Sequence, residues 1–448
     1  MNRVFDFIRN RLQGRPNLAR IIGNVGWLSF DKFFRMGIGV FVTILVARYL
    51  GAERFGLLSY AGSFVALFGV IASAGLQHIV VREIVGNNSS EGNLIGTSAA
   101  IQLFAGTVAY LGLISLTEYI GSDDPVLRAT ILILGITLPF KAAESVKYWF
   151  EAKVRSKYVV WALNSAFVIT AGTKLALVLL EAPVIYFAYA MAGESVIGAV
   201  ALMVLFTFKG LRIRSLKLRW VVAVRLLKAS WPLALSGIAV IVYMKIDQLM
   251  LGYMIGNEAV GIYSVAVRLS EIWYFIPMAI VASVFPAIIS AKSGSARNFY
   301  QRVQQLYDLM VLLAVCVAVP MTFLSDLAVT TLFGEEFAKA GMVLSLHVWA
   351  AVFVFLGVAS GRVYVAENAQ VISLQRSLLG ALVNVVLNLL LIPSYGPVGA
   401  ALATLVSYSI AALLFDSIQE RTRTMFFMKL RALNVIAASQ RLFVGESR

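Results

Sequence analysis

The sequence predicts an all-α integral membrane protein with about twelve transmembrane helices, and two observations carry that prediction. Of the 448 residues, 60% are hydrophobic and only 14% are charged, which is far from the balance of a soluble protein. The apolar residues also gather in stretches of roughly 20 residues, the length that an α-helix needs to cross a bilayer. Backbone groups inside a membrane must bond within their own segment, so these stretches are expected to be helices.

Charges, acidic turns and clusters of glycine or proline separate the apolar stretches. In the first half they cover residues 26–49, 55–76, 93–116, 127–148, 158–180 and 184–208. In the second half they cover residues 229–254, 259–289, 303–325, 341–364, 372–392 and 398–418. We expect an N-lobe of six helices at 25–208 and a C-lobe of six helices at 229–418. Residues 1–24, 209–228 and 419–448 are then an N-terminal segment, a basic linker and a basic tail.

Lysine and arginine are distributed unevenly between the two sides of this topology. The N-terminal segment, the even-numbered turns and the tail carry 28 of the 38 basic residues, and the opposite side carries 4. Because cytoplasmic loops carry the positive excess in membrane proteins, we expect both termini to lie in the cytoplasm. The basic linker and tail favour attraction to anionic membrane lipids, with no nucleic-acid partner.

One short motif recurs after 205 residues. Its residues are Leu50, Gly51, Ala52, Glu53, Gly56 and Ser59 in the first copy and Ile255, Gly256, Asn257, Glu258, Gly261 and Ser264 in the second. Each copy follows the first span of a six-span half, where glycine permits a tight reversal. We therefore expect two parallel lobes related by a pseudo-two-fold axis along the membrane normal, an architecture typical of transporters.

We single out eleven of the charged residues inside the predicted spans, because one charge near the bilayer centre costs about 2.5–3.5 kcal/mol on insertion scales. The basic ones are Lys32, Arg35, Lys141, Lys174, Lys245 and Arg268, and the acidic ones are Asp31, Glu144, Glu194, Asp247 and Glu271. Three pairs are one helical turn apart, namely Asp31 with Arg35, Lys141 with Glu144, and Arg268 with Glu271. Lys245 and Asp247 are two residues apart, so we expect them to contact different neighbours.

These charges allow two interpretations. In the first, each acid neutralises the base one turn away, or the lysine reaches the headgroups. In the second, the charges line a water-filled cavity between the lobes. The candidate groups for an anionic head group are Arg35, Lys141, Lys245 and Arg268, and the candidates for ion coupling or charge pairing are Asp31, Glu144, Asp247 and Glu271.

Nothing in the sequence predicts catalysis. Cys316 is the only cysteine and the two histidines, His78 and His347, are far apart, so we expect neither a disulfide nor a metal site. The sequence contains no phosphate-binding loop of the ATPase type and no Ser/His/Asp candidate. We expect no cofactor, and the short outer turns make a membrane glycosyltransferase or polymerase less favourable than a transporter.

Several motifs resemble those of the polysaccharide-biosynthesis flippases, the Wzx-type O-antigen flippases of the multidrug/oligosaccharidyl-lipid/polysaccharide (MOP) exporter superfamily. They include Lys245-Ile246-Asp247-Gln248, Val260-Gly261-Ile262-Tyr263, Leu332-Phe333-Gly334-Glu335-Glu336-Phe337 and Gly396-Pro397-Val398-Gly399. The likeness covers nearly the whole chain and is strongest from about residue 230 to 405.

This resemblance implies a MATE-like fold and a flippase of the bacterial inner membrane for undecaprenyl-pyrophosphate-linked oligosaccharide repeat units. The flippase would work by alternating access and be coupled to an ion. It further implies that basic cavity residues, here Arg35, Lys245 and Arg268, hold the pyrophosphate and that Asp31 couples transport to protons or sodium. The expected partners are a polyprenyl-pyrophosphate-linked glycan, membrane lipids and other membrane proteins of polysaccharide assembly. The alternative is a MATE-type exporter of drugs or other small cations, which favours net negative charge around its cavity.

Overall fold

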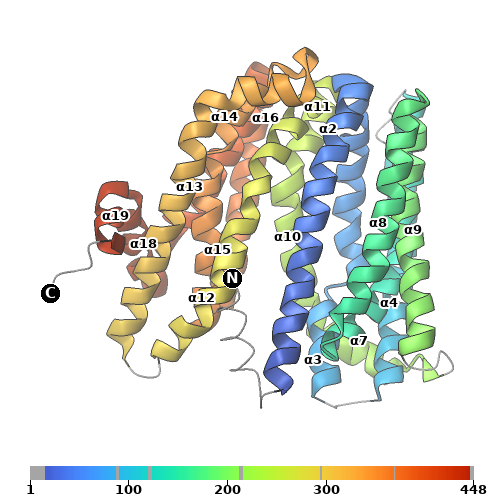
Figure 1. Ribbon diagram of the computed structural model, residues 1–448, viewed down its shortest axis with the longest axis horizontal. Helices are drawn as coiled ribbons and strands as arrows, with labels where there is room; N and C mark the ends of the chain where they lie inside the picture. The colour runs from blue at the N-terminus through green and yellow to red at the C-terminus, as the bar shows by residue number, and fades with distance from the viewer. Residues whose placement is uncertain are drawn as a thin grey trace, which may run out of the picture. The chain divides into compact units, whose positions relative to one another are not determined.

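The computed structural model describes residues 16–86, 90–119, 124–210, 215–292, 295–367 and 369–443, and nearly all of them are helical (Figure 1). Ten helical stretches among them are long and apolar enough to cross a membrane. The first spans 56 residues and the last 48, and each contains one non-helical residue, Gly51 or Gly396. Each of these two stretches is long enough for two crossings, so the ten stretches can accommodate the twelve predicted spans.

The chain divides into two compact units. Unit 1 contains residues up to Tyr49 together with Phe64–Ile238, and unit 2 contains Leu50–Ser63 and Ala239–Arg448. The division therefore runs through two helices, α2 (Pro16–Ser73) and α10 (Trp220–Met254). The other helices of unit 1 are α3 (Gln77–Val85), α4 (Glu91–Tyr119), α5 (Pro125–Gly135), α6 (Thr137–Phe140), α7 (Glu144–Ala152), α8 (Ser156–Leu179) and α9 (Val184–Lys209). The other helices of unit 2 are α11 (Asn257–Glu271), α12 (Phe275–Lys292), α13 (Ala296–Phe333), α14 (Ala340–His347), α15 (Ala350–Ala366), α16 (Gln370–Ser409), α17 (Phe415–Ile418), α18 (Glu420–Leu433) and α19 (Val435–Phe443).

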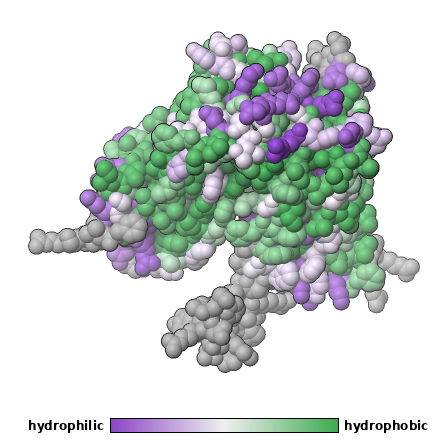
Figure 2. All heavy atoms as spheres, turned by 45° about the horizontal axis from the view of Figure 1, so that its top comes forward, coloured by the Kyte–Doolittle hydropathy of each residue, from purple (hydrophilic) through white to green (hydrophobic). Residues whose placement is uncertain are grey.

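Each unit has its own hydrophobic core, and in both cores aromatic side chains fill much of the space. In unit 1, the Trp149 ring packs edge to face on Phe150 and Phe206 at centroid distances of 5.0 and 5.8 Å. In unit 2, Tyr307 and Phe355 are completely buried between α13 and α15. Large apolar side chains also cover much of the visible surface, as Figure 2 shows, while hydrophilic residues gather toward the helix ends. This distribution is that of helices surrounded by lipid.

Two spans change helical type next to charged residues. A 3-10 turn, Lys141–Ala143, separates α6 from Glu144 at the start of α7. A second 3-10 turn, Ile272–Tyr274, follows Glu271 at the end of α11. Pro139 lies just before the first turn, where a missing backbone N–H helps to break the α-helical pattern.

The two copies of the repeated motif lie against each other within unit 2. Gly51 and Gly256 have φ angles of +72° and +126°, so the tight reversals predicted from glycine are confirmed. A Cβ atom on Gly56 would lie 1.8 Å from the carbonyl oxygen of Asn257, and one on Gly261 would lie 2.0 Å from that of Ala52. The two helices therefore cross backbone to backbone, and only glycine fits at either crossing point.

The chain beyond the last span forms helices α18 and α19, which lie beside α13 (Figure 1). The Lys429 ammonium donates to Asp416 Oδ2 at 2.5 Å, and both side chains are fully buried. Burial lowers the pKa of Lys429 to about 8, while the neighbouring Asp416 acts in the opposite direction. Arg441 donates two hydrogen bonds of 2.8 Å to the buried Asp308 carboxylate of α13.

Candidate functional site

A polar cavity of about 220 Å³ lies within unit 1, among α2, α8, α9 and the segment from α6 to α7. Arg35 of α2 donates to Asp31 at 3.1 Å, one turn away, and to Glu194 of α9 at 3.4 Å. Its guanidinium also lies over the Phe167 ring of α8 at 5.0 Å. The cavity lining includes Arg35, Thr137, Lys141, Glu144, Glu194 and Ser195.

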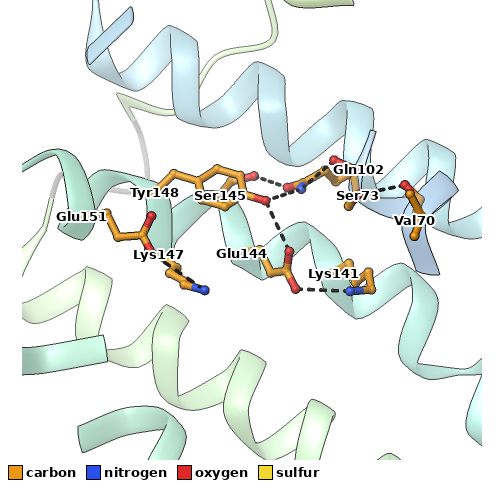
Figure 3. A network of polar contacts seen from close by, with 9 residues as sticks. All are labelled: Val70, Ser73, Gln102, Lys141, Glu144, Ser145, Lys147, Tyr148 and Glu151. Carbon is orange, nitrogen blue, oxygen red and sulfur yellow. Dashed lines mark hydrogen bonds and ion pairs between the residues drawn. The ribbon is translucent and has the colours of Figure 1, made fainter. Parts of the chain in front are cut away.

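The opposite wall of the cavity is held by a hydrogen-bond network that Figure 3 shows. The Lys141 ammonium lies 3.3 Å from Glu144, and Glu144 accepts from the Tyr148 hydroxyl at 3.2 Å. Gln102 of α4 donates to the same hydroxyl at 3.0 Å and accepts from Ser145 at 2.6 Å. The carboxylate of Glu144 is therefore fixed on one side and available to the cavity on the other.

The charged groups of this cavity are reachable by a ligand. The side chains of Arg35 and Glu194 each keep 29% of their surface exposed, and those of Lys141 and Glu144 keep 33% and 37%. Arginine binds phosphate oxygens in a planar fork, whereas lysine acts as a point charge. An anion at Arg35 has to compete with two carboxylates that already accept from it.

Unit 2 holds a different kind of polar site around Asp247 of α10. The carboxylate is 2% exposed and accepts from Tyr263 at 2.6 Å, from Thr404 at 2.5 Å and from Asn388 at 2.5 Å. Asn388 also donates to Asn384, one turn away at 3.2 Å, and its own Oδ1 atom has no hydrogen-bond partner. Within the described residues, neutral oxygen and nitrogen atoms alone contact this buried acid.

Three further charges predicted from the sequence act on one another in unit 2. Both Lys245 and Arg268 exert their positive charge on Glu271. The Arg268 side chain is exposed, and its guanidinium lies 5.9 Å from the centre of the Phe55 ring. Asp247 contacts Tyr263, Asn388 and Thr404, and a different neighbour for Lys245 stays a prediction.

The two ion pairs that helical spacing predicts in unit 1, Asp31 with Arg35 and Lys141 with Glu144, are present. Sequence reasoning missed the neutral groups around Asp247, namely Tyr263, Asn384, Asn388 and Thr404, although two asparagines one turn apart in an apolar span were a usable signal. The sequence also identified Glu194 as a charge inside a span but did not predict that Arg35 is its partner. The convergence of Arg35 with Lys245 and Arg268 on one chamber stays a prediction, since these residues belong to different units.

Comparison with known proteins gives a consistent set of similarities. The profile of the polysaccharide biosynthesis protein family matches residues 21–292, and that of the MatE family matches residues 232–390. The probable flippase AglR of Haloferax volcanii is 25% identical over 84% of this chain and 79% of its own length. The probable low-salt glycan biosynthesis flippase Agl15 of the same organism is 23% identical over 86% and 81%.

Solved structures show the same fold. The lipid II flippase MurJ in an inward closed conformation superposes with a TM-score of 0.70 at 15% identity, over 93% of this chain and 91% of its own. An inward-facing multidrug resistance MATE family transporter of the MOP superfamily gives a TM-score of 0.67 at 12% identity, over 92% and 99%. The predicted MATE-like fold is confirmed.

Proposed function

The chain belongs to the polysaccharide biosynthesis protein family, and from this premise we propose that it is a flippase for undecaprenyl-pyrophosphate-linked oligosaccharides. It moves these units across the cytoplasmic membrane for the synthesis of surface polysaccharide, with both termini on the cytoplasmic side. Other membrane proteins of polysaccharide assembly are its expected partners. Two relatives whose names describe them as probable flippases, one of them of glycan biosynthesis, support this assignment.

The observation that carries the proposal is the half-exposed pair of bases, Arg35 and Lys141, in the polar cavity of unit 1. A sugar head group cannot enter hydrocarbon, because its hydroxyl groups would lose their hydrogen bonds to water. A cavity with charged and hydroxyl side chains replaces some of those bonds. We propose that Arg35 and Lys141 bind the pyrophosphate. Lys245 and Arg268 are the proposed anion-binding groups of unit 2.

Ion coupling is the second part of the proposal. Asp31, the coupling residue that the resemblance implies, accepts a hydrogen bond from Arg35 and is thereby neutralised. Asp247 is the better candidate, because it is buried with hydroxyl and amide groups around it and Asn388 has a free acceptor atom beside it. We propose that Asp247 binds a proton or a monovalent cation during the transport cycle.

Reconstituted transport tests the anion site. The full chain is placed in proteoliposomes with a fluorescent undecaprenyl-pyrophosphate oligosaccharide, and arrival in the opposite leaflet is followed by its accessibility to a quencher. Arg35→Gln is expected to slow transport about tenfold to a hundredfold, as loss of a charge-assisted hydrogen bond implies. The matched control is Arg128→Gln, because Arg128 pairs with Glu118 at 3.1 Å outside the cavity. Equal transport by both variants would refute the role of Arg35.

Export of small organic cations is the second candidate function. It is favoured by the three carboxylates around Arg35 and Lys141, namely Asp31, Glu144 and Glu194, and by the match to the MatE family. In the same proteoliposomes, uptake of ethidium that Glu194→Gln abolishes, with no movement of the lipid-linked oligosaccharide, would support the exporter and contradict the flippase.

A further inference from the structure

An aromatic groove of about 790 Å³ lies on the flank of unit 1, between the first part of α2 and the middle of α8. Trp27, Phe30 and Phe34 line it from α2, where their spacing places them on one helical face. Trp161 lines it from α8, with its ring centroid 6.0 Å from that of Trp27. Phe30 and Trp161 are 51% and 58% exposed, so the groove is open along its length.

One side chain of the groove, that of Asn164, is polar and buried but makes no hydrogen bond. Asn164 is 8% exposed, and both polar atoms of its amide lack a hydrogen-bond partner. A buried amide without partners is costly, typically by about 1–3 kcal/mol per group. Such a group in an otherwise apolar wall indicates a ligand that brings a hydrogen-bonding atom with it.

Basic groups lie at two places along the groove. The Lys157 ammonium lies 5.3 Å from the centre of the Trp27 ring. In the other direction, the Phe34 ring packs on Phe167 at 6.4 Å, and the Arg35 guanidinium covers that same Phe167 ring. Phe167 therefore contacts both a ring of the groove and the Arg35 guanidinium of the polar cavity.

We propose that this groove binds the polyprenyl chain of the lipid-linked substrate next to its phosphate, an inference that rests on the proposed flippase function. The methyl-branched, unsaturated units of such a chain pack against the aromatic rings. The Asn164 amide donates to a non-bridging oxygen of the phosphate, which undecaprenol lacks, and the phosphate faces Arg35. The substrate is then held at two adjoining places, its tail in the groove and its head in the cavity.

Site-specific cross-linking tests the groove in the full-length protein in nanodiscs. The photoreactive residue p-benzoylphenylalanine replaces Trp161 and, as a matched control, Phe323, which is 82% exposed on α13 of unit 2. The probes are undecaprenyl phosphate and dioleoyl phosphatidic acid, and adducts are identified by mass. We expect undecaprenyl phosphate to label position 161 at least about tenfold more than position 323, the ratio that a preference of 1.4 kcal/mol gives. Equal labelling at both positions, or equal labelling of position 161 by phosphatidic acid, overturns the proposal.

A second variant separates the tail from the phosphate. Asn164→Leu keeps an apolar wall of similar size, so it is expected to leave the affinity for undecaprenol unchanged and to lower that for undecaprenyl phosphate about tenfold. Equal effects on both lipids would contradict the role of the amide.

Parallel transport measurements keep the two proposals distinct. A protein that moves the lipid-linked oligosaccharide while position 161 stays unlabelled refutes the groove alone. A protein labelled at position 161 that moves no lipid-linked oligosaccharide refutes the flippase function and supports the groove.

Discussion

The two units treat charges inside the membrane in opposite ways. In unit 1, Arg35, Glu194, Lys141 and Glu144 pair with one another while remaining about a third exposed. In unit 2, Asp247 and Asp416 are almost completely buried, and Asp416 pairs with the buried Lys429 of α18, beyond the last span. The difference shows that a charged residue in a span can have one of two roles. When it is exposed to a cavity, it can exchange its ion-pair partner for a ligand. When it is fully buried, it stabilises the fold or binds an ion.

The largest effect on stability is expected from the most enclosed pair. Lys429→Met leaves Asp416 buried without its cation and should destabilise the protein by about 3–5 kcal/mol. Thermal unfolding of the purified protein in detergent measures the change. The double variant Lys429→Met with Asp416→Leu should recover much of the loss, because no uncompensated charge is left. An unchanged Tm for the single variant would show that the pair is not enclosed.

The next largest effect concerns Asp247. Asp247→Asn places an amide N–H₂ among three donor groups, so it should lower the free energy of unfolding by about 1–3 kcal/mol. It should also remove the dependence of transport on an ion gradient. Transport is measured with a proton gradient and with a sodium gradient separately, which identifies the ion. Asp124→Asn is the control, because Asp124 belongs to unit 1, where it caps the N-terminus of α5 by accepting from the backbone N–H groups of Val126 and Leu127. Gradient-dependent transport by Asp247→Asn would contradict the coupling role.

A smaller change in stability is expected in unit 1. Asp31 and Arg35 are 23% and 29% exposed and lie 3.1 Å apart, so Asp31→Asn should cost only about 0.5–1 kcal/mol. Anion binding should improve, because Arg35 loses one competing carboxylate. Titration with inorganic pyrophosphate, followed by thermal stabilisation, measures this, and weaker stabilisation than in the wild type would contradict it.

The smallest effect is expected at the surface. Lys339 and Glu258 lie 3.7 Å apart with 80% and 62% of their side chains exposed. Lys339→Ala should leave both Tm and transport unchanged, since solvent already screens the pair. A measurable loss of stability would indicate that this end of unit 2 is less exposed than the structure shows.

The sequence predicted what depends on local geometry and missed what depends on distant contacts. The spans and the pairs one helical turn apart, such as Asp31 with Arg35, follow directly from helix periodicity. The partner of Arg35 on α9 is 159 residues away along the chain, and helix periodicity cannot select it among several acids.

Neutral polar residues were harder still to predict. Hydroxyl side chains in spans often bond to their own helix, as Ser283 does with the carbonyl oxygen of Ala279 at 2.9 Å. The Thr404 hydroxyl lies 3.0 Å from the carbonyl oxygen of Ala400 and 2.5 Å from Asp247 Oδ2, and its single proton can go to only one of them at a time. Sequence alone does not separate the first role from the second, so the cluster around Asp247 required the structure.

The glycine crossing has a symmetry that the repeat explains. Gly56 meets Asn257, and Gly261 meets Ala52, which is the position equivalent to Asn257 in the other copy. Reciprocal contacts of this form are those by which two identical subunits associate around a two-fold axis. A six-span ancestor would have met its own copy through this glycine, and gene fusion would then have enclosed a former dimer interface within one polypeptide.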